Sequence, residues 1–245
     1  MTRLAARHNA INLAQGFPNF AAPQWLKDAA IRAIQDDINQ YAVTWGAPDL
    51  RNAISEKYSN HYGWAVDPDL EITVGCGSTE CMIATILAVV DPGEQILVLE
   101  PFYENYGPDA IIADASSVFT RLDPNQAWAL DLQGLENTIQ KSLPAGGVRA
   151  VILNSPHNPT GKVFSQSELT GLARLANQYD FYVITDEIYE HIVYDGLSHT
   201  LLASLPGMKE RTITISGLSK SYSVTGWRIG YILAPPDLTK GIRKV

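Results

Sequence analysis

The sequence predicts an α/β protein of three layers, in which helices cover both faces of a seven-stranded, mainly parallel sheet. Runs of β-branched and other apolar residues alternate along the chain with longer segments of helical periodicity. Most of the strand-like runs are continuously apolar, which is typical of strands that are covered on both faces. The connections between them are rich in Gly, Pro, Asn and Ser, as expected for loops.

The elements follow in order along the chain. Continuous apolar or β-branched runs predict strands at 71–75, 94–100, 116–122, 148–154, 181–186, 211–216 and 228–234. Helical patterns predict helices at 23–36, 48–62, 78–90, 131–143 and 165–180, and the final stretch DLTKGIRKV is also helix-like.

Composition excludes several classes of partner. The 245 residues are 46% hydrophobic and 18% charged, which suits a soluble globular protein with a sizeable core. A net charge of -8 argues against nucleic acid and against an anionic membrane. Cys76 and Cys81 have no second pair to complete a metal site, so we expect structural thiols and no metal. The amino-terminal stretch lacks a signal-like apolar core, and a cytoplasmic location fits best.

Ligands of open α/β sheets bind at the carboxyl ends of the strands. At the first such end, TVGCGSTE, a strand runs into glycines and then into a helix whose first turn carries Ser78 and Thr79. Free amides and the helix dipole would suit a phosphate there, although the same residues are ordinary helix-starting residues. A dinucleotide fingerprint is excluded because Glu80 occupies the third glycine position. A nucleotide-phosphate loop is excluded because Val163 follows Gly161-Lys162.

Two further strand ends carry polar residues. In VILNSPHNPTGKVF, two prolines stiffen the loop and fix the direction of Asn158, and we interpret His157 as a loop hydrogen-bonding residue. In VITDEIYEHIVYDG, Asp186 follows a buried run and Tyr189 comes three residues later. An acid in this position either caps a helix or, if buried, needs a positive partner from the chain or from a ligand.

The last strand end is ISGLSKSYSVTGWRIG, in which Lys220 stands among small hydroxylated residues and Arg228 follows eight positions later. Together and in this order, GSTE, NPTG, DEIY and SKSYSVTGWRIG resemble the class I and II aminotransferases, which are fold type I enzymes dependent on pyridoxal phosphate. The resemblance covers nearly the whole chain. INLAQGFPNF, NQYAVTWGAPDLRNAI and LEPFYENYGP are similar to the amino-terminal, substrate-side and ring-stacking loops of this family.

The resemblance implies roles for the residues near Lys220. Lys220 corresponds to the lysine that holds the cofactor as a Schiff base and moves a proton at the substrate α-carbon. This role needs a partly neutral amine, and a neighbouring arginine lowers the affinity of a lysine for its proton. Arg228 corresponds to the arginine that meets the cofactor phosphate. Ser78, Thr79 and Ser219 would offer amides and hydroxyls to the same phosphate.

It also implies roles around the cofactor ring. Asp186 corresponds to the acid that pairs with the pyridine nitrogen, and Tyr189 and Asn158 to groups that hydrogen-bond the ring hydroxyl oxygen. Tyr103 corresponds to the aromatic residue that stacks on the ring. Tyr41 resembles the tyrosine that reaches the phosphate of the other subunit, which implies a homodimer.

The resemblance has two departures. Many relatives carry a phosphate-binding serine where this chain has Gly217, so either Ser216 or Ser219 replaces it or the contact is lost. The family also continues beyond Val245 with a small domain that carries the arginine for the substrate carboxylate. We therefore expect a fragment with little activity alone. Residues 1–38 would form an arm and part of the small domain, and residues 39–245 the large cofactor-binding domain.

The implied activity is transamination between an amino acid and a 2-oxo acid, with Lys220, Asp186 and Tyr189 as catalytic residues. A carbon-sulfur β-lyase would use the same lysine and aspartate but expel a thiol. A non-catalytic module, such as the sensory half of a transcription regulator, is a third interpretation. It is disfavoured because the chain contains no basic helix-turn-helix segment.

Overall fold

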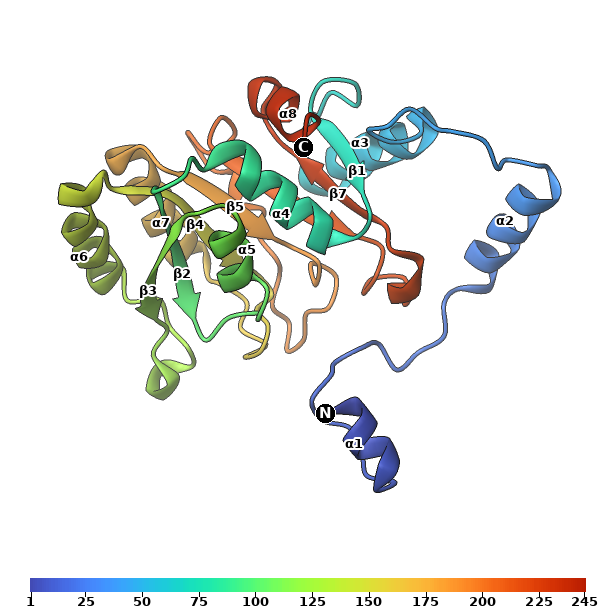
Figure 1. Ribbon diagram of the computed structural model, residues 1–245, viewed down its shortest axis with the longest axis horizontal. Coiled ribbons are helices and arrows are strands. Elements are labelled where there is room, and N and C mark those ends of the chain that lie inside the picture. The colour runs from blue at the N-terminus through green and yellow to red at the C-terminus, as the bar shows by residue number, and fades with distance from the viewer.

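The computed structural model describes residues 1–245, and it forms an α/β body from which two amino-terminal helices stand off (Figure 1). The strands are β1 (Ile72–Gly75), β2 (Gln95–Glu100), β3 (Ser116–Arg121), β4 (Val148–Asn154), β5 (Tyr182–Asp186), β6 (Thr212–Gly217) and β7 (Gly230–Leu233). The helices are α1 (Thr2–Arg7), α2 (Gln24–Gln35), α3 (Pro48–Tyr62), α4 (Ser78–Val89), α5 (Tyr106–Ile112), α6 (Leu132–Ser142), α7 (Gln166–Tyr179) and α8 (Pro236–Ile242). All the predicted strands and helices are present, with small shifts at their ends. The short helices α1 and α5 were not predicted, because so few turns give no periodic pattern.

The strands form one seven-stranded sheet in the order β1-β7-β6-β5-β4-β2-β3. The strands from β6 to β3 pair in parallel, while β7 is antiparallel to both of its neighbours. In the centre of the sheet, Asn154 pairs with Asp186, and Asp186 pairs with Ile215. The carboxyl ends of β4, β5 and β6 therefore lie side by side, as the prediction of a mainly parallel sheet requires.

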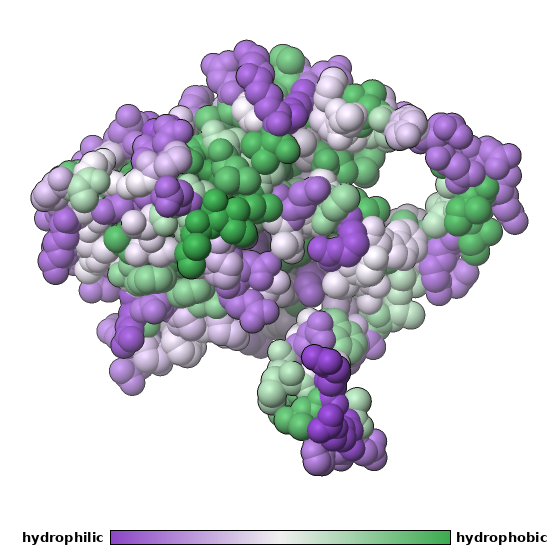
Figure 2. Space-filling view, in the orientation of Figure 1, coloured by the Kyte–Doolittle hydropathy of each residue, from purple (hydrophilic) through white to green (hydrophobic).

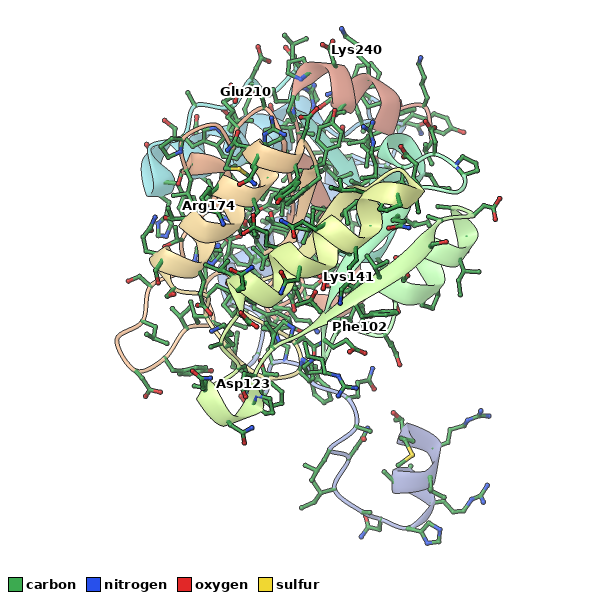
Figure 3. All side chains as sticks on the ribbon, turned by 90° about the vertical axis from the view of Figure 1, so that its left-hand side faces the viewer. Phe102, Asp123, Lys141, Arg174, Glu210 and Lys240 are labelled. Carbon is green, nitrogen blue, oxygen red and sulfur yellow. The ribbon has the colours of Figure 1, made fainter.

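Side chains of the central strands alternate between two core layers, which confirms the three-layer architecture. Along β2, Ile96 and Val98 pack into a cluster with residues of α4, α5 and α8, while Leu97 and Leu99 pack into a cluster with residues of α6 and α7. Helices α6 and α7 lie side by side over the second face, and the labelled Arg174 comes from α7 (Figure 3). The central parallel strands are thus apolar on both faces, which explains their continuous apolar runs in the sequence.

The amino-terminal helices contribute nothing to these cores. Neither α1 nor α2 contains a buried residue. On α2, Trp25 is 61% and Ile34 67% exposed, and the space-filling view shows open space between this region and the body (Figure 2). None of the helices combines the length and the apolar character needed to cross a bilayer.

The loop before α4 packs directly against the start of β7, and glycine is required at the contact. A Cβ at Gly230 would lie 2.5 Å from the Ser78 nitrogen and closer still to Gly77. Both neighbours are backbone atoms, so the crowding cannot be relieved by turning a side chain. The absence of a side chain at Gly230 therefore fixes where the amino terminus of α4 sits.

We predict that Gly230→Ala lowers the free energy of unfolding by about 2 kcal/mol, because the methyl group must push the α4 loop away from the sheet. Urea denaturation measures the change. Gly226→Ala is the matched control, since a Cβ there meets nothing within 4 Å. Equal stability of the two variants would show that the loop moves aside without cost.

Candidate active site

A cleft of about 550 Å³ opens at the carboxyl ends of β4, β5 and β6, beside the start of α4. Its lining contains all the predicted site residues of this chain but one: Ser78, Thr79, Tyr103, Asn158, Asp186, Tyr189, Ser219, Lys220 and Arg228. The exception is Tyr41, which is fully exposed on the segment between α2 and α3. The amino-terminal segment also contributes to the cleft through Ala14, Gln15 and Gly16.

One end of the cleft is formed by the amino terminus of α4. Neither Ser78 nor Thr79 caps the helix, since no side-chain cap hydrogen bond forms there. The Glu80 carboxylate instead accepts a hydrogen bond from the Cys76 amide. Because no side chain caps α4, its first backbone amides are free to bind a ligand in the cleft. Free amides at a helix amino terminus favour an anion.

Arg228 supplies a cation at the same end. Its backbone is left-handed, with φ of 56°, and its Nη1 donates to the Thr225 carbonyl at 3.1 Å. A Cβ at Gly77 would lie 2.5 Å from the Arg228 guanidinium, so the glycine allows the arginine to lie against the α4 loop. Positive charge and free amides therefore converge on one spot, where they suit a phosphate group.

Only one of the two serines suggested as a substitute at Gly217 reaches the cleft. The Ser216 hydroxyl is buried and donates to Glu190 at 2.8 Å, away from the cleft. Ser219 lines the cleft beside Lys220. Of the two serines, only Ser219 is placed where it could contact a phosphate in the cleft.

Lys220 is half-buried in the loop that follows β6. Its Nζ donates to the Gly16 carbonyl at 3.4 Å and lies 5.9 Å from the centre of the Tyr189 ring. Burial and the nearby Arg228 charge lower the pKa of Lys220, and Asp186 opposes them. The amine is therefore easier to deprotonate than a surface lysine, as a nucleophilic lysine requires.

Asp186 ends β5 and is buried at the floor of the cleft. Its carboxylate accepts hydrogen bonds from the Tyr106 hydroxyl at 2.7 Å and the Ile188 amide at 3.3 Å, but it forms no salt bridge. Burial raises the pKa of Asp186 even though both hydrogen bonds act to lower it. A buried carboxylate without a cationic partner fits a ligand that brings its own positive charge, such as a protonated ring nitrogen.

Polar side chains beside Asp186 complete the lining. Asn154 joins the two strand ends, because its Nδ2 donates to the Asp186 carbonyl at 2.8 Å and its Oδ1 accepts from the Asn158 amide at 2.6 Å. Burial, then Asp186 and Tyr103, raise the pKa of Tyr189 to about 12, so its hydroxyl stays a proton donor. His157 is a loop residue as expected, with Nδ1 2.7 Å from the Thr160 hydroxyl.

Sequence reasoning missed Tyr106 and Asn154. Tyr106 stands in the quoted FYENYGP segment, but only its contact with Asp186 across 80 residues gives it a place in the site. Asn154 ends a predicted strand, and this position was the available signal. With these two residues, the cleft offers an anion site, a buried carboxylate and a readily deprotonated amine, a set that fits pyridoxal phosphate.

Comparison with known proteins agrees with this geometry. The model of the family "Aminotransferase class I and II" matches residues 8–245. The probable N-succinyldiaminopimelate aminotransferase of Mycobacterium tuberculosis is 42% identical over 244 residues, which are 99% of this chain and 60% of the relative. Human kynurenine–oxoglutarate transaminase 1 is 37% identical over 250 residues, which cover 99% of this chain and 59% of the relative.

Solved structures give the same result. N-succinyldiaminopimelate aminotransferase from Mycobacterium tuberculosis superposes with a TM-score of 0.95 at 42% identity, covering 100% of this chain and 62% of that one. Aspartate aminotransferase from Thermus thermophilus gives a TM-score of 0.91 at 33% identity, covering 99% of this chain and 62% of that one. The chain thus spans about 60% of the length of the curated relatives named here. A match across nearly all of its residues shows that the chain belongs to the class I and II aminotransferases, a family of pyridoxal-phosphate-dependent enzymes.

Proposed function

We propose that this chain binds pyridoxal phosphate in the cleft and serves transamination between an amino acid and a 2-oxo acid. The observation that carries the proposal is the meeting of Lys220, Asp186 and Arg228 around one cleft at the strand ends. The relatives support the reaction class, since they are named as aminotransferases or transaminases. Their names differ in the amino acid, so they support the class of substrate rather than one member of it.

The cofactor, when bound, supplies an electron sink for the bond that breaks at the substrate α-carbon. The chain's own residues would hold and tune it. The α4 amides and Arg228 would bind the phosphate, with Ser78, Thr79 and Ser219 from the cleft lining as hydroxyl donors. Asp186 would keep a proton on the ring nitrogen, because a buried carboxylate is stabilised by a cation directly opposite.

The remaining lining residues would orient the ring and move the proton. Tyr103, which lines the cleft, would cover one face of the ring, while Tyr189 and Asn158 would donate hydrogen bonds to its hydroxyl oxygen. The Lys220 amine would hold the cofactor and would carry the proton at the substrate α-carbon. The lowered pKa of Lys220 favours both tasks, since each needs the neutral amine.

We also propose that residues 1–38 form an arm and part of a small domain beside the cofactor-binding domain of residues 39–245, and that two copies pair as a homodimer. Tyr41 is fully exposed, and Ile11, Leu13 and Phe17 are more than half exposed on the preceding segment. These side chains would be covered by a second copy, with Tyr41 reaching the phosphate in the partner's cleft. Two free cysteines support a cytoplasmic location, where thiols stay reduced.

We predict that the protein mixed with pyridoxal phosphate absorbs visible light and that Lys220→Ala abolishes this band. Borohydride reduction followed by peptide mapping should place the label on Lys220. Lys141→Ala, which removes an exposed amine on α6, is the control and should keep the band. A label on another lysine, such as Lys162, would refute the assignment. Pyruvate and ammonia formed without a 2-oxo acceptor would identify a β-lyase instead.

A second prediction concerns the cofactor-free protein. Asp186→Asn should raise the free energy of unfolding at neutral pH by about 1 kcal/mol, because it removes a buried charge that the fold does not compensate. The pKa of Asp186 is raised on folding, so the wild type loses stability as pH rises from the ordinary carboxyl range through the folded value. The gain of the variant should therefore disappear at acid pH, below the ordinary value of 3.8.

Urea denaturation at several pH values measures this difference. Asp36→Asn, at an exposed carboxylate directly after α2, is the control and should change little. A less stable Asp186→Asn protein at neutral pH would mean that the carboxylate is compensated within the fold.

A further inference from the structure

A cluster of buried polar side chains lies behind the turn that follows β5, outside the cleft. The Glu190 carboxylate, whose side chain is fully buried, accepts hydrogen bonds from Lys57 Nζ at 2.6 Å, the Tyr62 hydroxyl at 2.7 Å and the Ser216 hydroxyl at 2.8 Å. Lys57 Nζ also donates to the Tyr231 hydroxyl at 2.9 Å. We call these five residues the Glu190 cluster; none of them lines the cleft.

The turn divides its side chains between the two sides. Asp186 and Tyr189 line the cleft, whereas Glu187 and Glu190 are buried away from it. Glu187 has its own partner there, because His199 Nε2 lies 2.9 Å from its carboxylate. Asp186 and Tyr189 are thus each followed directly by a carboxylate that is anchored on the opposite side.

The cluster also reaches both ends of the loop that carries Lys220 and Arg228. Ser216 is on β6, four residues before Lys220, and Tyr231 is on β7, three residues after Arg228. Glu190 contacts Ser216 directly and Tyr231 through Lys57. One carboxylate therefore ties the turn of Tyr189 to the two strands that hold the Lys220 loop.

The partners are arranged to keep Glu190 charged. Burial alone would raise its pKa, but the Lys57 charge and the three hydrogen bonds lower it. Burial would likewise lower the pKa of Lys57, and Tyr231 and Glu190 outweigh that effect. A buried ion pair is seldom more stabilising than apolar side chains of the same size, so its directed hydrogen bonds point to a role in orientation.

We propose that Glu190 is a positioning residue, which sets the orientation of Tyr189 and Asp186 toward the cofactor by fixing the turn to β6, β7 and α3. The inference rests on the proposed function for its consequence at the cofactor. The anchoring of the turn itself is a property of the chain alone.

Two measurements on the whole chain test the proposal. Hydrogen exchange of the cofactor-free protein reports the turn, where the amides of Ile188, Glu190 and Ile192 are hydrogen-bonded within residues 186–192. Glu190→Gln should speed exchange there by about tenfold relative to the rest of the chain. With pyridoxal phosphate added, the pH midpoint of the visible band should move in the same direction as in Tyr189→Phe. The movement should be on the order of half a pH unit.

Matched variants separate orientation from general stability. Glu168→Gln removes the carboxylate of the Lys162–Glu168 pair, whose side chains are 9% and 13% exposed and lie outside the cleft. This control should leave both the turn and the midpoint unchanged. The double variant Lys57→Met with Glu190→Gln should recover part of the protection, because no unpaired charge remains. Tyr62→Phe removes one hydrogen bond and serves as the milder variant if Glu190→Gln does not fold.

The outcomes are distinct. The proposal would be overturned if the turn exchanged at the wild-type rate in both Glu190→Gln and Tyr62→Phe. It would also be overturned if exchange became faster evenly over the whole chain. A wild-type midpoint in both variants would overturn it as well. If the unmodified chain shows no visible band with the cofactor, the proposed function fails, and hydrogen exchange still decides whether Glu190 fixes the turn.

Discussion

The carboxylate of Asp186, buried without a cation, is the interaction on which the rest of the site depends. Burying a charge without a compensating partner costs free energy, so neighbouring groups must hold the Asp186 carboxylate in place. The Tyr106 hydroxyl and the Ile188 amide do so directly, and Asn154 fixes the backbone of the same residue. Lys220, across the cleft, has a lowered pKa and does not neutralise Asp186 through a salt bridge. The cleft is therefore poised for a ligand that is positive at one end.

Close backbone contacts decide the other end of the cleft. Gly77 and Gly230 let the α4 loop, Arg228 and β7 approach closely, so the arginine and the α4 amides lie at the same end of the cleft. Similar crowding surrounds Gly217. A Cβ at Gly217 would lie 2.6 Å from the Ile229 carbonyl oxygen, so this backbone does not admit a serine there. Ser219, next to Lys220 in the chain, is the nearby serine that lines the cleft.

Local patterns predicted the fold and the cleft residues, and long-range contacts supplied what they missed. Apolar runs located every strand, and the polar residue after a run identified Asp186, since strand ends of a parallel sheet meet at one edge. Nothing local marks Tyr106 or Lys57 as part of this region. Lys57 is 133 residues from Glu190 in the sequence, although the two side chains form a hydrogen bond. The sequence pattern of α3 around Lys57 is that of an ordinary surface helix. Tyr41 was predicted from resemblance, and this single chain brings it to no contact in the cleft.

Two carboxylates of the turn after β5 show how the chain separates binding from support. Asp186 and Glu190 are both buried, four residues apart, yet only Glu190 has a lysine beside it. Burial raises the pKa of Asp186, while Lys57 and three hydrogen bonds lower that of Glu190 despite burial. The Asp186 carboxylate, which has no cationic partner, faces the cleft. The Glu190 carboxylate, which has Lys57 and three hydrogen bonds, faces away from it. Because both lie on one short turn, the energy that anchors Glu190 also holds Asp186 in its unfavourable position until a ligand compensates it.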